Sequence, residues 1–164
     1  MIMESSALSE PELLAYSRAH LRYELWMFLR TGQYLVDTPD PTNEAERVLE
    51  NAMVESFVIH LRNLISFLYS ERVESKDIVA ADFFQDANAW YQRRPTISQS
   101  LKKARERSHK EVVHLTTDRI AEKTPEKEWP VSKLVGEIQR LMRLFANLAS
   151  PQRLDRSVNE LLSK

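Results

Sequence analysis

Residues 48–68 of the chain read VLENAMVESFVIHLRNLISFL. Apolar residues recur there every three or four positions, which is the period of an α-helix. They cover more than half of the helix circumference, at Val48, Leu49, Ala52, Met53, Phe57, Leu61, Leu64, Ile65 and Leu68. A helix that is apolar over so much of its surface belongs at the centre of a bundle. We therefore predict a long central helix that is capped at Thr42 or Asn43 and ends near Tyr69.

The composition of the whole chain favours an all-α protein. There are only 2 glycines, whereas strand-rich proteins need more turn glycines and β-branched runs. The length of 164 residues suits one domain, so we expect a single helical bundle over 1–164 with residues 1–8 frayed. Cysteine is absent, which excludes disulfides, thiolate nucleophiles and cysteine-ligated zinc.

Three further long helices follow from the same periodicity. The first begins with a capping box at Ser9, with Pro11 and Glu12 in its first turn, and extends to about Gly32. The others run from Thr96 or Ser98 to about Ala121 and from about Ser132 to Ala149. Residues 71–95 are too long and too apolar for a bare loop, so we expect them to pack over the bundle. The prediction is an up-and-down bundle of four long helices, with a packed connection between the second and third and a short C-terminal helix.

The N-terminal residues 1–8 lack the basic and apolar regions of a secretory signal. The most apolar stretch, residues 53–69, is interrupted by Glu55, His60, Arg62 and Asn63, which excludes an ordinary membrane-spanning helix. We therefore expect a cytoplasmic protein without a membrane partner.

Basic residues are concentrated in one segment, 92–110, which holds a single acid, Glu106. Such an excess attracts polyanions such as RNA, and Trp90 and Tyr91 just ahead of it could stack on bases. The alternative is a solvated helix face whose charge is balanced by acids of neighbouring helices. The candidate RNA-binding residues are Arg93, Arg94, Lys102, Lys103, Arg105 and Lys110, beside Arg107.

A polar stripe follows the 96–121 helix. Arg107, Glu111, His114 and Asp118 fall within about 60° of one another when each residue advances the helix by 100°. Arginine clamps phosphate and histidine titrates near neutrality, so this pair suits attack of a ribose 2′-hydroxyl on the adjacent phosphate. The alternative is structural, with Arg107–Glu111 and His114–Asp118 as i,i+4 pairs.

Arg107, six intervening residues and His114 resemble the Arg-x(4–6)-His motif of HEPN domains, a family of small helical bundles. The resemblance implies a homodimer in which two motifs face a shared cleft, and metal-independent ribonuclease activity of the toxin or phage-defence kind. It also implies a protein partner such as an antitoxin. Arg107 would stabilise phosphate charge, His114 would handle protons or orient the 2′-hydroxyl, and Glu111 and Asp118 would orient the two.

Helix geometry separates the two motif residues. Arg107 and His114 lie about 10 Å apart along the axis, and Arg107 leans toward the N-terminus, away from His114. One chain would not easily assemble a compact site from them, but a dimer could. A dimer interface therefore decides whether the stripe is a site.

A second resemblance rests on HLRNLI at 60–65 and KEVVHLT at 110–116, which look like the paired helix signatures of an uncharacterised bacterial helical family. That resemblance implies no activity. Ser56, His60 and Asn63 align on the central helix among apolar neighbours, and buried polar groups need partners. We expect them to form a polar network with another helix, with His114 as one candidate, and we favour a role in fixing helix register.

Metal binding is a further alternative, because His20, His60 and His114 lie on three different helices and three histidines can hold a divalent ion. The two Glu-x-x-His patterns at 106–109 and 111–114 share one helix, about 140° apart, which excludes a ferritin-like di-iron site. We expect no cofactor. The chain contains no glycine-rich phosphate loop and no Gly-x-Ser-x-Gly elbow.

Overall fold

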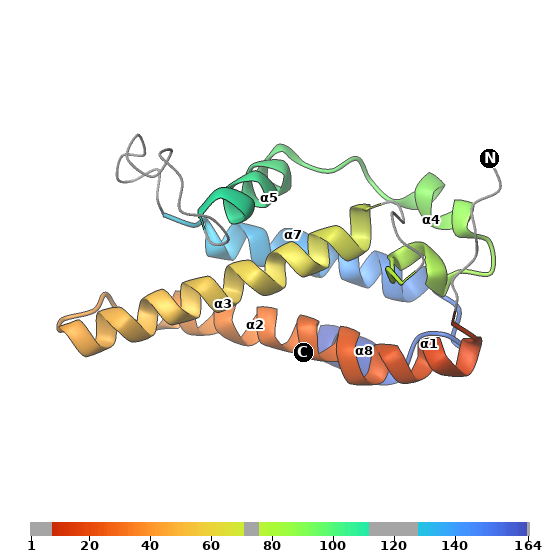
Figure 1. The fold of residues 1–164 in the computed structure, drawn as a ribbon, viewed down its shortest axis with the longest axis horizontal. Helices are drawn as coiled ribbons and strands as arrows, with labels where there is room; N and C mark the ends of the chain where they lie inside the picture. The colour runs from red at the N-terminus through yellow and green to blue at the C-terminus, as the bar shows by residue number, and fades with distance from the viewer. Residues whose placement is uncertain (1–7, 71–75, 112–127, 164) are drawn as a thin grey trace.

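The computed structural model describes residues 8–70, 76–111 and 128–163, with backbone alone for Lys110 and Glu111. These residues form helices without a strand, which confirms the predicted all-α bundle (Figure 1). The elements in chain order are α1 (Glu10–Tyr16), η1 (Ser17–Leu21), α2 (Arg22–Asp37), α3 (Glu44–Tyr69), η2 (Ala80–Phe83), α4 (Ala87–Arg93), α5 (Gln99–Glu111), α7 (Val131–Leu148) and α8 (Arg156–Leu162).

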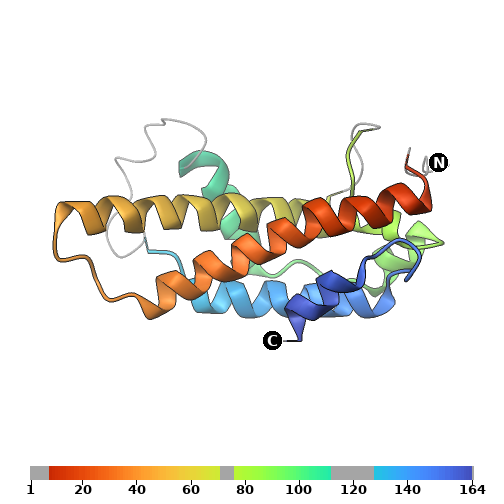
Figure 2. The same cartoon turned by 90° about the horizontal axis from the view of Figure 1, so that it is seen from below.

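Three of the four long helical segments run up and down, as predicted. The α1–η1–α2 segment and α3 form an antiparallel pair, and α7 runs opposite to α2. The described part of α5 crosses α3 at a steep angle (Figures 1 and 2). α8 folds back against α2 and α7. The predicted second helix begins where Asn43 Oδ1 accepts a hydrogen bond from Glu46 N at 3.0 Å, and it ends at Tyr69.

The first helix is longer than predicted and contains a π-helical turn. It continues past Gly32 to Asp37 and ends ahead of Pro39, because the residue before a proline resists the helical conformation. The predicted start is confirmed, since the Glu12 carboxylate accepts from Ser9 N at 2.8 Å. The π turn η1 was not predicted. Its first residue, Ser17, is buried and accepts a hydrogen bond from Asp155 N at 2.9 Å.

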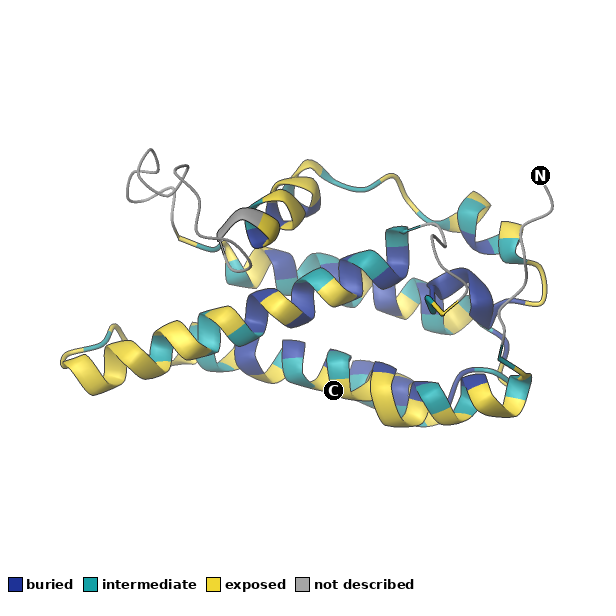
Figure 3. Ribbon diagram, in the orientation of Figure 1, coloured by how far each residue is buried: buried dark blue, intermediate teal, exposed yellow. Residues whose placement is uncertain are grey.

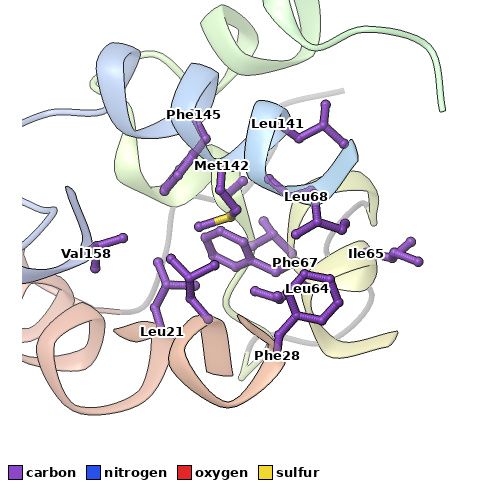
Figure 4. Close-up of a cluster of buried hydrophobic side chains, with 14 of the residues drawn as sticks. Leu21, Phe28, Leu64, Ile65, Phe67, Leu68, Leu141, Met142, Phe145 and Val158 are labelled. Atoms are coloured by element: carbon purple, nitrogen blue, oxygen red, sulfur yellow. The ribbon is translucent and has the colours of Figure 1, made fainter. Parts of the chain in front are cut away.

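The core is rich in aromatic side chains from distant parts of the chain (Figure 4). Phe28 of α2 stacks on Phe57 of α3 with ring centroids 5.0 Å apart. Phe67, Phe83 and Phe145 meet edge to face at 5.2–5.7 Å. Because Phe83 belongs to η2, the connection between α3 and α5 packs into the bundle, as the sequence predicted.

The N-terminal half of α3 lies outside this core, which corrects one prediction. Val48 and Leu49 are 63% and 45% exposed, and Ala52 is exposed as well. In the described part of the chain this end of α3 extends beyond the other helices (Figure 3). The apolar pattern of residues 48–53 therefore does not mark core positions, and the buried part of α3 begins at Phe57.

None of the helices in the described ranges is both long enough and apolar enough to cross a membrane.

Candidate functional site

One face of α5 presents basic side chains to solvent. Ser98 Oγ accepts a hydrogen bond from Leu101 N at 3.1 Å and so begins the helix, which selects Ser98 from the two predicted caps. Leu101, Ala104 and Ser108 are buried at helical spacing, as predicted from their periodicity. The same periodicity leaves other positions of the helix in solvent. These include the predicted RNA-binding residues Lys102, Lys103 and Arg105, with one exposed acid, Glu106, among them.

Arg107 lies on the flank of this face, half-buried against its own chain. Its guanidinium carbon is 4.1 Å from the centroid of the Trp129 ring, and Nη1 donates to Glu128 O at 3.1 Å. A cation held over a tryptophan face has a restricted orientation. Three of its predicted partners, the Glu111 side chain, His114 and Asp118, lie outside the described residues, as does the Lys110 side chain. The structure therefore places Arg107 but not the rest of the stripe.

The two arginines that precede α5, Arg93 and Arg94, lie in different environments. Arg93 is exposed at the end of α4. Arg94 is half-buried, donates to Leu68 O at 3.2 Å, and lies over the rings of Tyr91 and Tyr69 at 4.8 and 5.6 Å. Its contacts thus join α4 to the end of α3.

Trp90 is not available for base stacking, contrary to the sequence interpretation. It is 1% exposed, packs on Phe84 and Phe145, and donates through Nε1 to Leu68 O at 2.9 Å. Tyr91 is half-buried beneath the Arg94 guanidinium. The aromatic pair therefore belongs to the packed connection between α3 and α5.

A second polar site joins α2 to α3 through the carboxylate of Glu24. His60 Nδ1 lies 2.7 Å from Glu24 Oε2, and Asn63 Nδ2 donates to the same oxygen at 3.0 Å. An ionised carboxylate only accepts hydrogen bonds, so His60 carries a proton on Nδ1 and has Nε2 left for other contacts. The ring of Tyr23 meets the His60 ring edge-on at 5.7 Å. His60 is buried and Tyr23 is largely exposed.

The charge state of Glu24 follows from these contacts. Burial alone raises the pKa of this carboxyl group, but the hydrogen bonds from His60 and Asn63 and the charges of His60 and His20 outweigh burial. The pKa of Glu24 therefore lies below its ordinary value, and the group is ionised at neutral pH.

The sequence predicted two residues of this polar cluster, His60 and Asn63, but not the carboxylate that they bind. It predicted that His60 and Asn63 meet a polar group of another helix, and that group is Glu24, whereas Ser56 has no hydrogen bond to it. The sequence analysis did not predict Glu24 as that group. Its position between Leu21, Leu25 and Phe28, which are all buried, was the signal that could have revealed it.

The predicted three-histidine metal site is described only in part. His20 is exposed and its ring lies 5.0 Å from that of Tyr16, His60 is held by Glu24, and His114 is outside the described residues. Within the described ranges, no three histidine, aspartate or glutamate side chains are grouped so that they could hold a metal ion.

Comparison with protein-family models, with curated proteins and with solved structures gave no match for this chain.

Proposed function

We propose that this protein is a HEPN-like RNA-binding bundle that contacts the RNA backbone through the basic face of α5 and cleaves RNA without a metal. The observation that carries the proposal is the exposure of Lys102, Lys103 and Arg105 on a helix whose opposite side is buried. Long basic side chains on one helix face neutralise phosphates and release counterions. The Arg107–His114 spacing resembles the HEPN motif, and this resemblance supports the proposed RNA cleavage.

Arg107 is suited to a phosphate contact by its setting. Stacking on Trp129 and the bond to Glu128 O orient the guanidinium before a ligand arrives. A restricted arginine loses less conformational freedom on binding than a mobile one. The proposed chemistry then needs His114 as the proton-transferring group, contributed by the same chain or by a second copy.

Binding is tested by salt dependence with a matched control. A Lys102→Gln/Lys103→Gln/Arg105→Gln variant is compared with an Arg22→Gln/Arg47→Gln/Arg140→Gln variant, which removes as many charges from exposed positions on α2, α3 and α7. We expect the α5 variant to reduce the log–log salt slope for single-stranded RNA by about 2, and the control to leave it unchanged. Equal losses in both variants would mean that α5 is not the binding face.

Cleavage is tested separately, by incubating the protein with mixed RNA in EDTA. We expect cleavage by the wild type and none by His114→Asn at an unchanged melting temperature. Arg107→Ala also removes the Trp129 stack, so Arg107→Lys is the better variant, because it keeps a charge but not the planar fork. Cleavage that persists in both variants excludes this site, while RNA binding without any cleavage retains the binding half of the proposal alone.

A specific observation favours a second candidate function, a non-enzymatic dimerisation module. The hairpin formed by the end of α2 and the start of α3 carries Val36, Val48 and Leu49, which are 51%, 63% and 45% exposed. Exposed apolar side chains gathered in one region are typical of protein interfaces. Light scattering of Val48→Lys/Leu49→Lys tests it: a wild-type dimer that becomes a monomer supports the module, and a monomeric wild type excludes it.

A further inference from the structure

A cavity of about 400 Å³ lies between α2, α7 and α8, away from the basic face of α5. These three helices pack against one another (Figure 2). The cavity is open to solvent on one side. Its lining includes Trp26, Arg30 and Gln33 of α2, Ser132 and Gln139 of α7, and Leu161 of α8. A volume of several hundred Å³ is ordinary for a small-molecule site.

The lining of this cavity carries a positive charge and no negative charge. Arg30 is the charged residue of its lining, and no acid lines it. Across the described ranges, the Arg30 side chain makes neither a hydrogen bond nor an ion pair, and it is exposed. Gln33 donates to Asp37 at 2.7 Å, so that nearby carboxylate already has a partner. The cavity therefore presents one positive charge without a counterion from its own walls.

The remaining lining provides a flat apolar surface and a few polar groups. Trp26 is 39% exposed, whereas Trp90 is 1% exposed. Leu29, Val36 and Val135 add aliphatic surface around it. The side chains of Gln139 and Ser132 have no hydrogen bond to any described residue. Because α2 and α7 run in opposite directions, Gln139 lies toward the Trp26 end of the cavity and Ser132 toward the Val36 end.

Two glycines give the cavity its shape. α2 approaches α7 so closely at Gly32 that an added Cβ would lie 2.7 Å from Val135 Cγ2. At Gly136 the space is open, because an added Cβ would meet only Arg140 Nη1, at 3.6 Å. Gly32 thus sets the separation of the two helices, and Gly136 lines the cavity without contributing a side chain to it.

We infer that this cavity binds a small aromatic monocarboxylate, whose ring lies against Trp26 and whose carboxylate is held by Arg30. A planar guanidinium binds a carboxylate through two parallel hydrogen bonds, and a single cation matches a single negative charge. The aliphatic walls and the tryptophan favour a ring. The inference is independent of RNA binding, since no residue of α5 lines the cavity.

The test uses indole-3-acetate and its neutral counterpart indole-3-acetamide, measured by ligand-observed NMR and calorimetry. We expect the acid to bind with a dissociation constant of about 1 mM or tighter, as is usual for a ligand of this size. Arg30→Gln should weaken the acid about tenfold and leave the amide unchanged. Arg47→Gln, which removes an exposed charge on α3 outside the cavity lining, is the matched control.

A second pair of variants tests the location. Gly136→Ala should retain binding, whereas Gly136→Leu should fill the cavity and abolish it, with both variants folded by thermal melting. No binding by the wild type, equal binding of acid and amide, or unchanged binding in Gly136→Leu would each overturn the inference. Binding of adenosine monophosphate in place of indole-3-acetate would overturn the carboxylate class.

Discussion

Glu24 of α2 and His60 of α3 form a hydrogen-bonded pair at 2.7 Å across the interface between these two helices. Asn63, one turn further along α3, bonds to the same carboxylate oxygen at 3.0 Å. Two donors on one helix face thus converge on one acceptor of the other helix. Since a shift of α3 by one residue would rotate both donors by about 100°, the pair fixes the register of the two helices.

Glu24→Gln should destabilise the protein by about 1–3 kcal/mol at pH 7, because it leaves buried His60 without a charged acceptor. The pKa of Glu24 is lowered by folding, so its stabilisation is complete above the unfolded value of 4.5 and is lost as the pH falls through the folded value. The variant should therefore lose less stability than the wild type on acidification below that pH. Urea denaturation at several pH values measures both effects.

Glu160→Gln is the control for this prediction. Glu160 pairs with Arg156 at 3.7 Å, but both side chains are mainly exposed. We expect a change within about 0.5 kcal/mol, as is usual for surface ion pairs. A comparable loss in both variants would contradict the special role of the Glu24 carboxylate.

Alanine at the two glycines should have opposite effects. Gly32→Ala should cost about 1–3 kcal/mol, because its Cβ would lie 2.7 Å from Val135 Cγ2 and 3.2 Å from Phe57 Cε2 in a closely packed region. Gly136→Ala should stabilise by about 0.5–1 kcal/mol, since alanine favours a helix and the added methyl meets no obstacle. Melting temperatures of the two variants check the sign, and stabilisation by Gly32→Ala would be inconsistent with the close approach of α2 and α7.

Trp90→Phe should lower stability by about 1 kcal/mol or somewhat more, because the indole Nε1 bond to Leu68 O is lost in the core. The cost is limited because Arg94 Nη1 also donates to that carbonyl, at 3.2 Å. RNA affinity of the folded variant should be unchanged, since the ring is buried. A selective loss of RNA binding at unaltered stability would restore the base-stacking interpretation.

The loss of folding stability at acid pH should depend in part on Asp155. Hydrogen bonds from Ser157, followed by the contact with Arg18, lower the pKa of this buried carboxyl from 3.8 to about 2. Its contribution is therefore complete above pH 3.8 and is lost between that value and about 2. Asp155→Asn keeps a good helix cap for α8 but should flatten the stability profile over this interval. An unchanged profile would show that the ionised form gives no stabilisation.

The sequence predicted the helices well because their signals are local. The cap at Asn43 and the capping box at Ser9 depend on neighbours in the chain. Periodicity also predicted the buried side of α5. The length and apolar composition of residues 71–95 predicted that this connection packs over the bundle. Periodicity failed at Val48 and Leu49, because apolar spacing does not tell how far the neighbouring helices extend.

Less of the candidate sites than of the helices could be predicted from the sequence. The exposure of Lys102, Lys103 and Arg105 follows from helix period once the buried side is known. The different roles of Arg93 and Arg94 do not, because they depend on where the end of α3 lies. Arg107 was identified as a polar residue of interest, but its stacking on Trp129 joins residues far apart in sequence.

By itself the sequence determined the fold class, the starts of the first three long helices and the inward side of α5, since these depend on backbone hydrogen bonding and on residues within one or two turns. Only the tertiary structure decided that His60 and Asn63 meet Glu24, that Trp90 is part of the core, and that Gly32 brings α2 against α7. The physical reason is that helix period fixes which residues share a face. Which faces meet, and at what separation, depends on side-chain packing between segments that are distant in the chain.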